Sequence, residues 1–169
     1  MKLDNNTIVY IDMDGVLCRW NTEASVEDTF EDGYFLGREE ETAVKDMILA
    51  LMRDGYSVSI LSAAYEEGTA KADKQQWLID HGLGEVPATF VPYGQDKNEY
   101  VASGNQVLLD DFSRNLHAWE QAGKTGVKFM NGINGNHGSW NGYVITNRMT
   151  AEQMAVILKA VAAEAGGAA

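Results

Sequence analysis

Residues 8–17 read IVYIDMDGVL, and this short stretch indicates the architecture of the whole chain. The β-branched run Thr7–Ile11 is typical of a buried strand, and two acids follow where the strand ends. Asp12 and Asp14 are two residues apart, which places both carboxylates on one side of an extended chain. Gly15 then allows a sharp turn. Two partly desolvated acids repel each other, so a hard cation such as Mg²⁺ is the natural compensation, and a turn or helix cap is the alternative.

A second acidic pair follows another apolar run, in the stretch QVLLDDFSRN. Asp110 and Asp111 come directly after Gln106–Leu109, where an Asp that caps the next helix would also be expected. The carboxyl ends of parallel strands lie at the same edge of a sheet. If the two strands are neighbours, four carboxylates converge, and their mutual repulsion would be severe without a cation. The two pairs together therefore predict a divalent metal site.

The rest of the chain alternates between strand-like and helix-like segments. Further strands are expected at Ser57–Leu61, Thr89–Val91, Gln106–Leu109 and Val127–Met130. Helices are expected at Glu39–Asp54, in the segment that ends at His81–Gly82, between Asp111 and Gly123, and after Thr150 as N-cap. This alternation predicts an α/β fold with a Rossmann-like parallel sheet and helices on both faces.

Two segments do not follow the alternation. Arg19–Gly33 has no clear periodicity and is expected to form a small lid inserted after the first strand. Residues 131–143, NGINGNHGSWNGY, are rich in Gly and Asn and are expected to form an irregular loop. We therefore expect one domain over residues 1–165 and a frayed tail over 166–169.

Composition excludes several functional classes. The chain has 169 residues, enough for one domain, and 13 basic against 25 acidic residues give a net charge of −12. Because Lys and Arg are not clustered, double-stranded nucleic acid is not an expected partner. No apolar run is long enough to span a bilayer, the N-terminus does not read as a signal peptide, and the single Cys18 excludes an internal disulfide. A cytoplasmic protein with no membrane partner is expected.

A phosphate site is the natural complement of this acidic edge. Ser62 ends the second strand, where its hydroxyl and the neighbouring backbone N–H groups could hold a phosphate oxygen. A bound phosphoryl group also needs a cation, and Lys74 and Lys97 are the candidates. Each lysine taken alone could equally be a solvated surface residue.

These motifs resemble the four ordered motifs of the haloacid dehalogenase-like (HAD) phosphatase superfamily. The resemblance rests on DMDGVL at 12–17, the strand that ends in Ser62, a lysine upstream of the fourth strand, and LLDD at 108–111. Residues 33–64, KADKQQWLIDHGLG at 71–84 and QDKNEYV at 95–101 resemble the 5′(3′)-deoxyribonucleotidase branch. The chain departs from that branch in carrying Ser62–Ala63 where Thr-Ser is expected, and in its short lid.

The resemblance implies a Mg²⁺-dependent phosphomonoester hydrolase that works through an aspartyl-phosphate, most readily a 5′-nucleotidase acting on (deoxy)nucleoside monophosphates. Asp12 would be the nucleophile, and Asp14 would protonate the leaving alkoxide and then activate water. The phosphoryl oxygens would be held by Ser62, Ala63 and Lys97, with Lys74 as an accessory. Mg²⁺ would be bound by Asp12, Asp110 and the backbone carbonyl of Asp14, with Asp111 acting through water or further hydrogen bonds.

Other aromatic and histidine residues are weaker candidates. Trp20 in the lid could stack on a nucleobase, and His137 in the 131–143 loop could contact substrate, although packing explains either. Trp140 could stack or anchor the same loop. Five further residues are expected to be structural or inert: Cys18, Trp77, His81, His117 and Trp119.

Three alternatives are weighed against the nucleotidase. A receiver domain would place its phosphoacceptor Asp at the end of the third strand, where this chain has none. A non-catalytic HAD-like binding protein would normally have lost Asp12 or Asp14. A phosphatase of another small phosphomonoester, such as a sugar phosphate, remains open. The short lid also leaves open whether the site is exposed or is covered by the second subunit of a homodimer.

Overall fold

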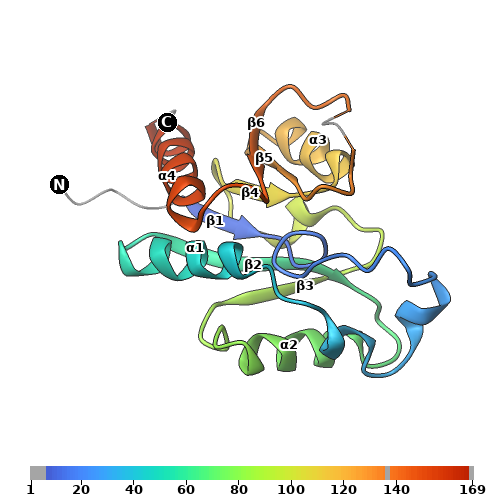
Figure 1. The fold of residues 1–169 in the computed structure, drawn as a ribbon. Coiled ribbons are helices and arrows are strands. Elements are labelled where there is room, and N and C mark those ends of the chain that lie inside the picture. Colours follow the sequence, from blue (N-terminus) through green and yellow to red (C-terminus); the bar gives the residue numbers. More distant parts are fainter. Residues whose placement is uncertain (1–6, 136–137, 168–169) are drawn as a thin grey trace.

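The computed structural model describes residues 7–135 and 138–167, which form a single parallel sheet with helices packed on it (Figure 1). The strands are β1 Ile8–Ile11, β2 Ser57–Ala64, β3 Ala88–Pro92, β4 Val107–Asp110, β5 Thr125–Met130 and β6 Tyr143–Thr146. The α-helices are α1 Thr42–Arg53, α2 Ala70–Asp80, α3 Ser113–Gln121 and α4 Ala151–Gly167. The 3₁₀ helices are η1 Glu27–Phe30, η2 Tyr34–Gly37 and η3 Lys97–Tyr100.

The strand order is β3-β2-β1-β4-β5-β6, and every pair is parallel. The chain moves outward from β1 through β2 to β3, and then returns to β4 on the other side of β1. In sheets of this kind the crevice outside the carboxyl ends of the two central strands is where ligands bind. The reversal between β1 and β4 therefore locates the candidate site before any side chain is considered.

Alternate residues of the strands point to opposite faces of the sheet and contribute to two separate hydrophobic cores. Val9 and Ile11 of β1 face the larger core, which packs against α1, α2 and α4. Tyr10 faces a smaller core on the opposite side of the sheet, with Leu116 and Trp119 of α3. The central strands are thus buried on both faces, which explains their nearly continuous apolar sequence. The Rossmann-like α/β fold with helices on both faces is confirmed.

The structure differs from the sequence-based expectations at three boundaries. β2 continues to Ala64, so that Ser62 lies inside the strand and not at its end. The loop predicted over residues 131–143 ends in β6, a short edge strand that the sequence analysis missed. α4 continues to Gly167, so residues 166 and 167 are helical where a frayed tail was expected, and residues 168–169 lie outside the described part. Among the described residues, no helix combines the length and apolar character needed to cross a bilayer.

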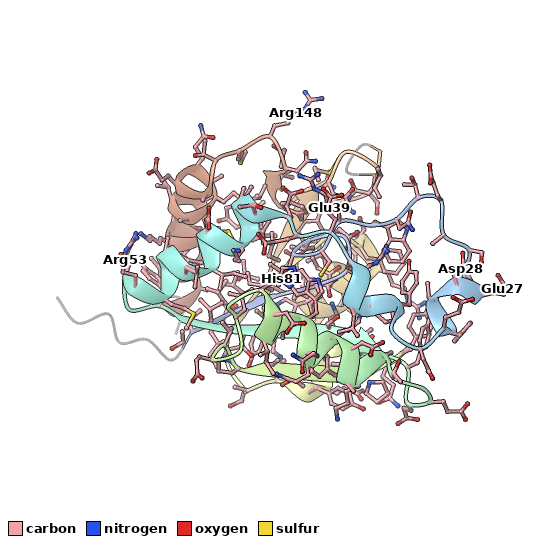
Figure 2. All side chains as sticks on the ribbon, turned by 60° about the horizontal axis from the view of Figure 1, so that its bottom comes forward. Glu27, Asp28, Glu39, Arg53, His81 and Arg148 are labelled. Carbon is pink, nitrogen blue, oxygen red and sulfur yellow. The ribbon has the colours of Figure 1, made fainter. Side chains whose placement is uncertain are left out.

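The lid is longer than the sequence analysis predicted. Cys18 and Glu40 form an antiparallel bridge, and the chain between them leaves the domain and returns. This insertion contains η1 and η2, and the labelled Glu27 and Asp28 lie at its outer end (Figure 2). The backbone N–H of Gly33 donates to Asp73 Oδ2 at 2.9 Å and to Thr69 Oγ1 at 3.1 Å, which fastens the lid to α2.

Trp140 anchors the loop between β5 and β6 in the smaller core. Its side chain is only 1% exposed, and its indole Nε1 donates to the carbonyl of Tyr143 at 2.9 Å. Gly126 of β5 makes room for the ring, since a Cβ at that position would lie 2.8 Å from it. Of the two roles that the sequence left open for Trp140, anchoring is the one that the structure shows.

We expect Trp140→Ala to lower the free energy of unfolding by about 3–5 kcal/mol, because the cavity it leaves lies between β5 and α3. Chemical denaturation followed by circular dichroism measures this loss. Val156→Ala on α4, where the side chain is 66% exposed, is the control and is expected to change stability by less than about 0.5 kcal/mol. Equal losses in the two variants would contradict the anchoring role.

Candidate active site

Three carboxylates meet at the carboxyl edge of β1 and β4. Asp12, Asp110 and Asp111 each offer an oxygen atom, and these oxygens all lie within 4.8 Å of one another. The parallel register pairs Ile11 with Leu109, so Asp12 and Asp110 continue two neighbouring strands from matched positions. The N–H of Asp12 still donates to the carbonyl of Leu109 at 3.0 Å, which holds the two strand ends together. The predicted convergence of the two acidic pairs is thus correct for three of the four acids.

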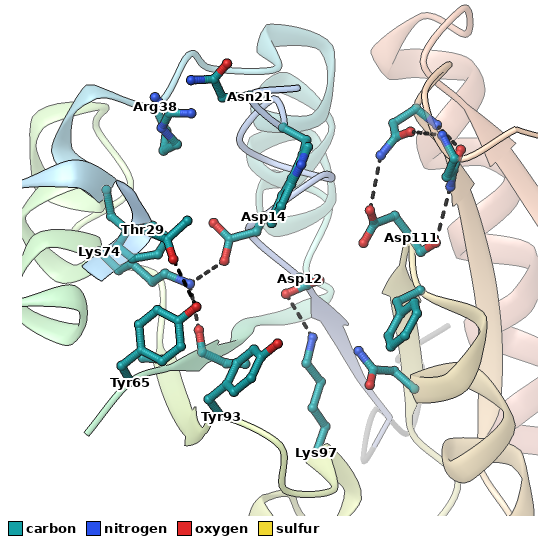
Figure 3. A pocket seen from close by; sticks show the side chains of 18 of the residues that line it. Asp12, Asp14, Asn21, Thr29, Arg38, Tyr65, Lys74, Tyr93, Lys97 and Asp111 are labelled. Atoms are coloured by element: carbon teal, nitrogen blue, oxygen red, sulfur yellow. Dashed lines mark hydrogen bonds and ion pairs between the residues drawn. The ribbon is translucent and has the colours of Figure 1, made fainter. Parts of the chain in front are cut away.

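Lys97 neutralises part of this cluster. Its Nζ lies 2.8 Å from Asp12 Oδ1 and 2.7 Å from Asp110 Oδ2, at the start of η3 (Figure 3). Asp110 also accepts hydrogen bonds from the N–H of Phe112 at 2.8 Å and from Asn115 Nδ2 at 3.0 Å. Asp110 therefore supports the loop ahead of α3 as well as the cluster.

One lysine does not offset three buried acids. Burial, followed by the negative charges of Asp110 and Asp14, raises the pKa of Asp12 to about 7 against the opposing effect of Lys97. Burial and the charges of Asp12 and Asp110 raise the pKa of Asp111 to about 8. The two nearby acids raise the pKa of Lys97 and outweigh the effect of its own burial, so Lys97 stays cationic. A cluster of hard oxygen donors with surplus negative charge fits a divalent cation such as Mg²⁺.

Asp14 belongs to a second, separate group. Its carboxylate forms an ion pair with Lys74, whose side chain is 1% exposed and comes from α2. Lys74 Nζ also donates to Ser62 Oγ at 3.0 Å and to the carbonyl of Ala63 at 2.6 Å, and it lies 4.5 Å from the centre of the Phe35 ring. The site therefore has two lysines with different acids. Lys97 serves the carboxylate cluster, and Lys74 serves Asp14.

Ser62 lies behind Lys74 and not at the cavity surface. It is completely buried, and its hydroxyl contacts Lys74, whereas Ala63 lines the cavity. The expected role of Ser62 in holding a phosphate oxygen stays a prediction. What the structure shows is that Ser62 and the carbonyl of Ala63 hold the ammonium group of Lys74 in place.

The loop after β5 supports Asp111, a feature that the sequence analysis missed. Asn131 Nδ2 donates to Asp111 Oδ2 at 3.1 Å and to the carbonyl of Gly15 at 2.9 Å. Asn134 Nδ2 donates to the carbonyls of Asp111 at 3.2 Å and Phe129 at 2.8 Å. The two asparagines therefore connect the end of β5 to both acidic loops.

Gly15 is required where these loops meet. Its φ is +81°, and a Cβ at this position would lie 2.2 Å from Asp111 Oδ2. A side chain would therefore meet both backbone strain and a collision with the carboxylate. The sequence suggested Gly15 as a turn residue, and the structure adds that it makes room for Asp111.

A cavity of about 740 Å³ opens above both groups of charges (Figure 3). This volume lies in the range of roughly 300–1,000 Å³ that is typical of small-molecule sites. The floor carries Asp12, Asp14, Lys74, Lys97 and Asp111, and the lid contributes one wall. The lid residues that line it are Arg19, Trp20, Asn21, Thr22, Thr29, Tyr34, Phe35 and Arg38.

The remaining candidate residues from the sequence lie partly at the cavity and partly in the cores or on the helices. Trp20 lines the cavity and is 52% exposed, so its expected contact with substrate stays a prediction. His137 lies outside the described residues. Trp77 and Trp119 are completely buried in the two cores, as expected. His81 Nδ1 lies 2.8 Å from the carbonyl of Trp77 at the end of α2. His117 lies on α3 and contacts Ser139.

Cys18, which forms the lid bridge with Glu40, is buried. Burial and the charge of Asp14 raise the pKa of its thiol well above the ordinary range. The thiol therefore stays protonated, which agrees with the expectation that Cys18 is inert.

Comparisons with known proteins support the fold more than the function. No protein-family model matches the sequence, and no curated protein matches it significantly. Among solved structures, the chain is similar to the D,D-heptose 1,7-bisphosphate phosphatase of B. bronchiseptica, whose crystal structure contains magnesium and phosphate. The TM-score is 0.65 at 14% identity, over 91% of this chain and 98% of the other. The chain thus shares the fold of that phosphatase, and its acidic cluster lies at the carboxyl edge of the sheet, where sheets of this kind bind ligands.

We expect Asn131→Ala to raise the Mg²⁺ concentration for half-maximal thermal stabilisation by about 10- to 100-fold, the usual cost of losing a residue that orients a metal ligand. The reason is that Asp111 loses its only side-chain hydrogen bond recorded among the described residues. Asn134→Ala is the matched control, because its amide contacts backbone groups alone, the carbonyls of Asp111 and Phe129 and the N–H of Asn131. It should lower the melting temperature with a smaller change in Mg²⁺ requirement. An unchanged Mg²⁺ requirement in Asn131→Ala would contradict this role.

Metal binding and pH should be linked. In metal-free protein Asp12 and Asp111 keep protons that the unfolded chain releases near its ordinary pKa of 3.8. Their contribution to stability is therefore lost as pH rises from about 4 to about 8. Protons compete with Mg²⁺ for the same oxygens, so Mg²⁺ should raise the melting temperature more at pH 8 than at pH 6.

Thermal denaturation with Mg²⁺ or with a chelator measures this difference. A ligand at 100 times its dissociation constant stabilises the folded state by roughly 2.7 kcal/mol. Asp110→Ala should remove most of the Mg²⁺ effect at both pH values. A Mg²⁺ shift that is equal at pH 6 and pH 8, or that survives in Asp110→Ala, would exclude the carboxylate cluster as the metal site.

Proposed function

We propose that this protein is a Mg²⁺-dependent phosphomonoester hydrolase that acts through an aspartyl-phosphate. The observation that carries the proposal is the division of labour between the two acids of one loop. Asp12 faces Lys97 and the acidic cluster, whereas Asp14 turns away to Lys74. A nucleophilic carboxylate is favoured by a positive charge beside it, and a general acid must be held apart from that carboxylate. The different partners of Asp12 and Asp14 provide this separation.

Each acid suits one part of the reaction. Asp12 attacks phosphorus, and a new O–P bond forms as the bond to the leaving oxygen breaks. A substrate that binds as its phosphate monoanion brings the proton that Asp14, a carboxylate paired with Lys74 in the free site, takes up and then gives to the leaving alkoxide. In the second half Asp14 takes a proton from water, which attacks the aspartyl-phosphate and releases inorganic phosphate and free Asp12. General acid–base help of this kind is worth about 10²–10⁴-fold.

The charges of the floor support this assignment. Phosphoryl transfer depends mainly on positioning and on neutralising the charge of the three equatorial oxygens. Lys97 and Lys74 approach Asp12 and Asp14 from η3 and α2, so a phosphoryl group bound over Asp12 would lie between two ammonium groups. Mg²⁺ held by Asp12, Asp110 and Asp111 would supply the remaining positive charge.

For the substrate, we propose a (deoxy)nucleoside 5′-monophosphate. The support is the resemblance of residues 33–64, 71–84 and 95–101 to the 5′(3′)-deoxyribonucleotidase branch, together with the aromatic rings around the cavity. Trp20, Tyr65 and Tyr93 all line it, and a base could stack on any of them. A sugar phosphate is the second candidate, because the similar solved structure is named as a phosphatase of a sugar bisphosphate.

A panel of phosphomonoesters with Mg²⁺ decides between the two substrates. Higher kcat/KM on deoxynucleoside 5′-monophosphates than on hexose and heptose phosphates would support the nucleotidase. The opposite order would favour the sugar phosphate. Release of no phosphate from any ester, aryl phosphates included, would overturn the proposed function.

We expect Asp12→Asn to abolish Mg²⁺-dependent hydrolysis of p-nitrophenyl phosphate, because an amide cannot form the aspartyl-phosphate. Asp14→Asn should lose about 10²–10⁴-fold on alkyl phosphates and less on p-nitrophenyl phosphate, whose leaving group needs no proton. Phosphate release measures both. Asp46→Asn, an exposed position on α1, is the control. Undiminished turnover in Asp12→Asn would contradict the assignment.

A further inference from the structure

Five cationic side chains line the cavity, and they differ in what they pair with. Lys74 and Lys97 form ion pairs with the acids of the floor. Arg19 is held at the rim by Glu39 at 2.8 Å and Glu41 at 3.2 Å. Arg38 and Arg114 have no acidic partner within the parts of the chain that the structure describes, and of these only Arg38 is partly buried. Arg38 is therefore the one partly buried cation of the cavity that has no acidic partner among the described residues.

Arg38 is held rigidly from both ends. Its guanidinium carbon lies 4.4 Å from the centre of the Tyr34 ring, and Nη1 donates to the Tyr34 hydroxyl at 3.3 Å. Its carbonyl accepts a hydrogen bond from Trp77 Nε1 at 2.9 Å, which ties this part of the lid to α2. The planar guanidinium is thus oriented before any ligand arrives, and little side-chain entropy remains to be lost on binding.

One donor of the guanidinium, Nε, nevertheless lacks an acceptor. Arg38 Nε is buried, and it is the one buried side-chain nitrogen or oxygen among the described residues with no hydrogen-bond partner. A buried donor without an acceptor costs about 1–3 kcal/mol, and more when it is charged. In a chain of net charge −12, acids to pair with it are plentiful, yet none is placed here.

The position of Arg38 separates it from the reacting phosphoryl group. That group is defined by Asp12 with Lys97 on one side and by Asp14 with Lys74 on the other. Arg38 comes from the lid and lies with Asn21 on the side of Asp14 that is remote from Lys97 and Asp111 (Figure 3). A ligand atom at Arg38 would therefore belong to the leaving group and not to the transferred phosphate.

We propose that Arg38 binds a second anionic group of the substrate, a phosphate or a carboxylate on the leaving group, whose oxygens pair with the guanidinium fork. The inference rests on the proposed hydrolase activity. Because the leaving group of a (deoxy)nucleoside 5′-monophosphate is uncharged, it favours phosphomonoesters that carry another negative charge over that first substrate candidate. Carboxylates and phosphates are the acceptors that match the planar fork of arginine. The cavity is large enough to hold a small molecule between Asp12 and Arg38.

Matched substrate pairs test this directly. Glucose 1,6-bisphosphate is compared with glucose 6-phosphate, 6-phosphogluconate with glucose 6-phosphate, and a deoxynucleoside 3′,5′-bisphosphate with its 5′-monophosphate. In the wild-type protein, the member that carries the second anionic group should have the higher kcat/KM in at least one pair. Arg38→Gln should lower that ratio by about 10- to 100-fold, the expected effect of losing charge-assisted hydrogen bonds. The pair that responds tells whether the group is a phosphate or a carboxylate.

Two further variants keep the test decisive. Arg148→Gln removes the same charge from the outer surface, away from the cavity (Figure 2), and should leave every ratio unchanged. Arg38→Lys keeps the charge and loses the fork, so its ratio should fall between those of wild type and Arg38→Gln. It also decides the matter if Arg38→Gln does not fold, which its melting temperature reveals.

The failure of this inference is distinct from that of the proposed function. If wild-type protein hydrolyses p-nitrophenyl phosphate but every ratio is near one, or Arg38→Gln leaves the ratios as they were, the second anionic site is excluded and the hydrolase stands. If wild-type protein hydrolyses no phosphomonoester, both are overturned.

Discussion

The repulsion between acids at one edge of the sheet is the constraint on which the site depends. β1 and β4 are neighbours, so their terminal acids cannot avoid each other. The structure meets the problem by separation. Asp14 is drawn to Lys74, and Asp12 with Asp110 is drawn to Lys97. Both lysines are almost completely buried, where an ion pair is screened little by water. The same separation gives the two acids of one loop different charged partners.

Much of the fold could be predicted because its signals are local. The apolar strands, the helix periodicity and the position of Asp12 and Asp110 after strands are all visible within about ten residues of sequence. Parallel strands then bring the acids together, since their carboxyl ends share one edge. β6 was missed because Tyr143–Thr146 is a short edge strand, half-exposed, that follows a loop rich in Gly and Asn. The position of β6 depends on Trp140, whose side chain is buried against α3 and β5.

The parts of the site that could not be predicted depend on contacts between distant segments. Asn131 matters because it reaches both Gly15 and Asp111, which are 116 and 20 residues away. Ser62 was expected at a strand end, but β2 continues past it and turns its hydroxyl to Lys74. Arg38 reads as one of several charged residues in a polar stretch. Its position over the cavity depends on hydrogen bonds with Tyr34 and Trp77, which are visible only in the structure.

The lid leaves the domain and returns through a single antiparallel bridge, Cys18 to Glu40. Its hydrogen bonds to α2 run through its backbone groups, the N–H of Gly33 and the carbonyl of Arg38, and the Phe35 ring contacts Lys74. Backbone hydrogen bonds constrain the path of the chain and do not depend on the exposed side chains of the lid. Exposed side chains of the lid can accordingly change while Asp12, Asp14 and Asp111 on the floor of the cavity stay in place. For protein engineering, the residues between Cys18 and Glu40 are the segment to graft or randomise.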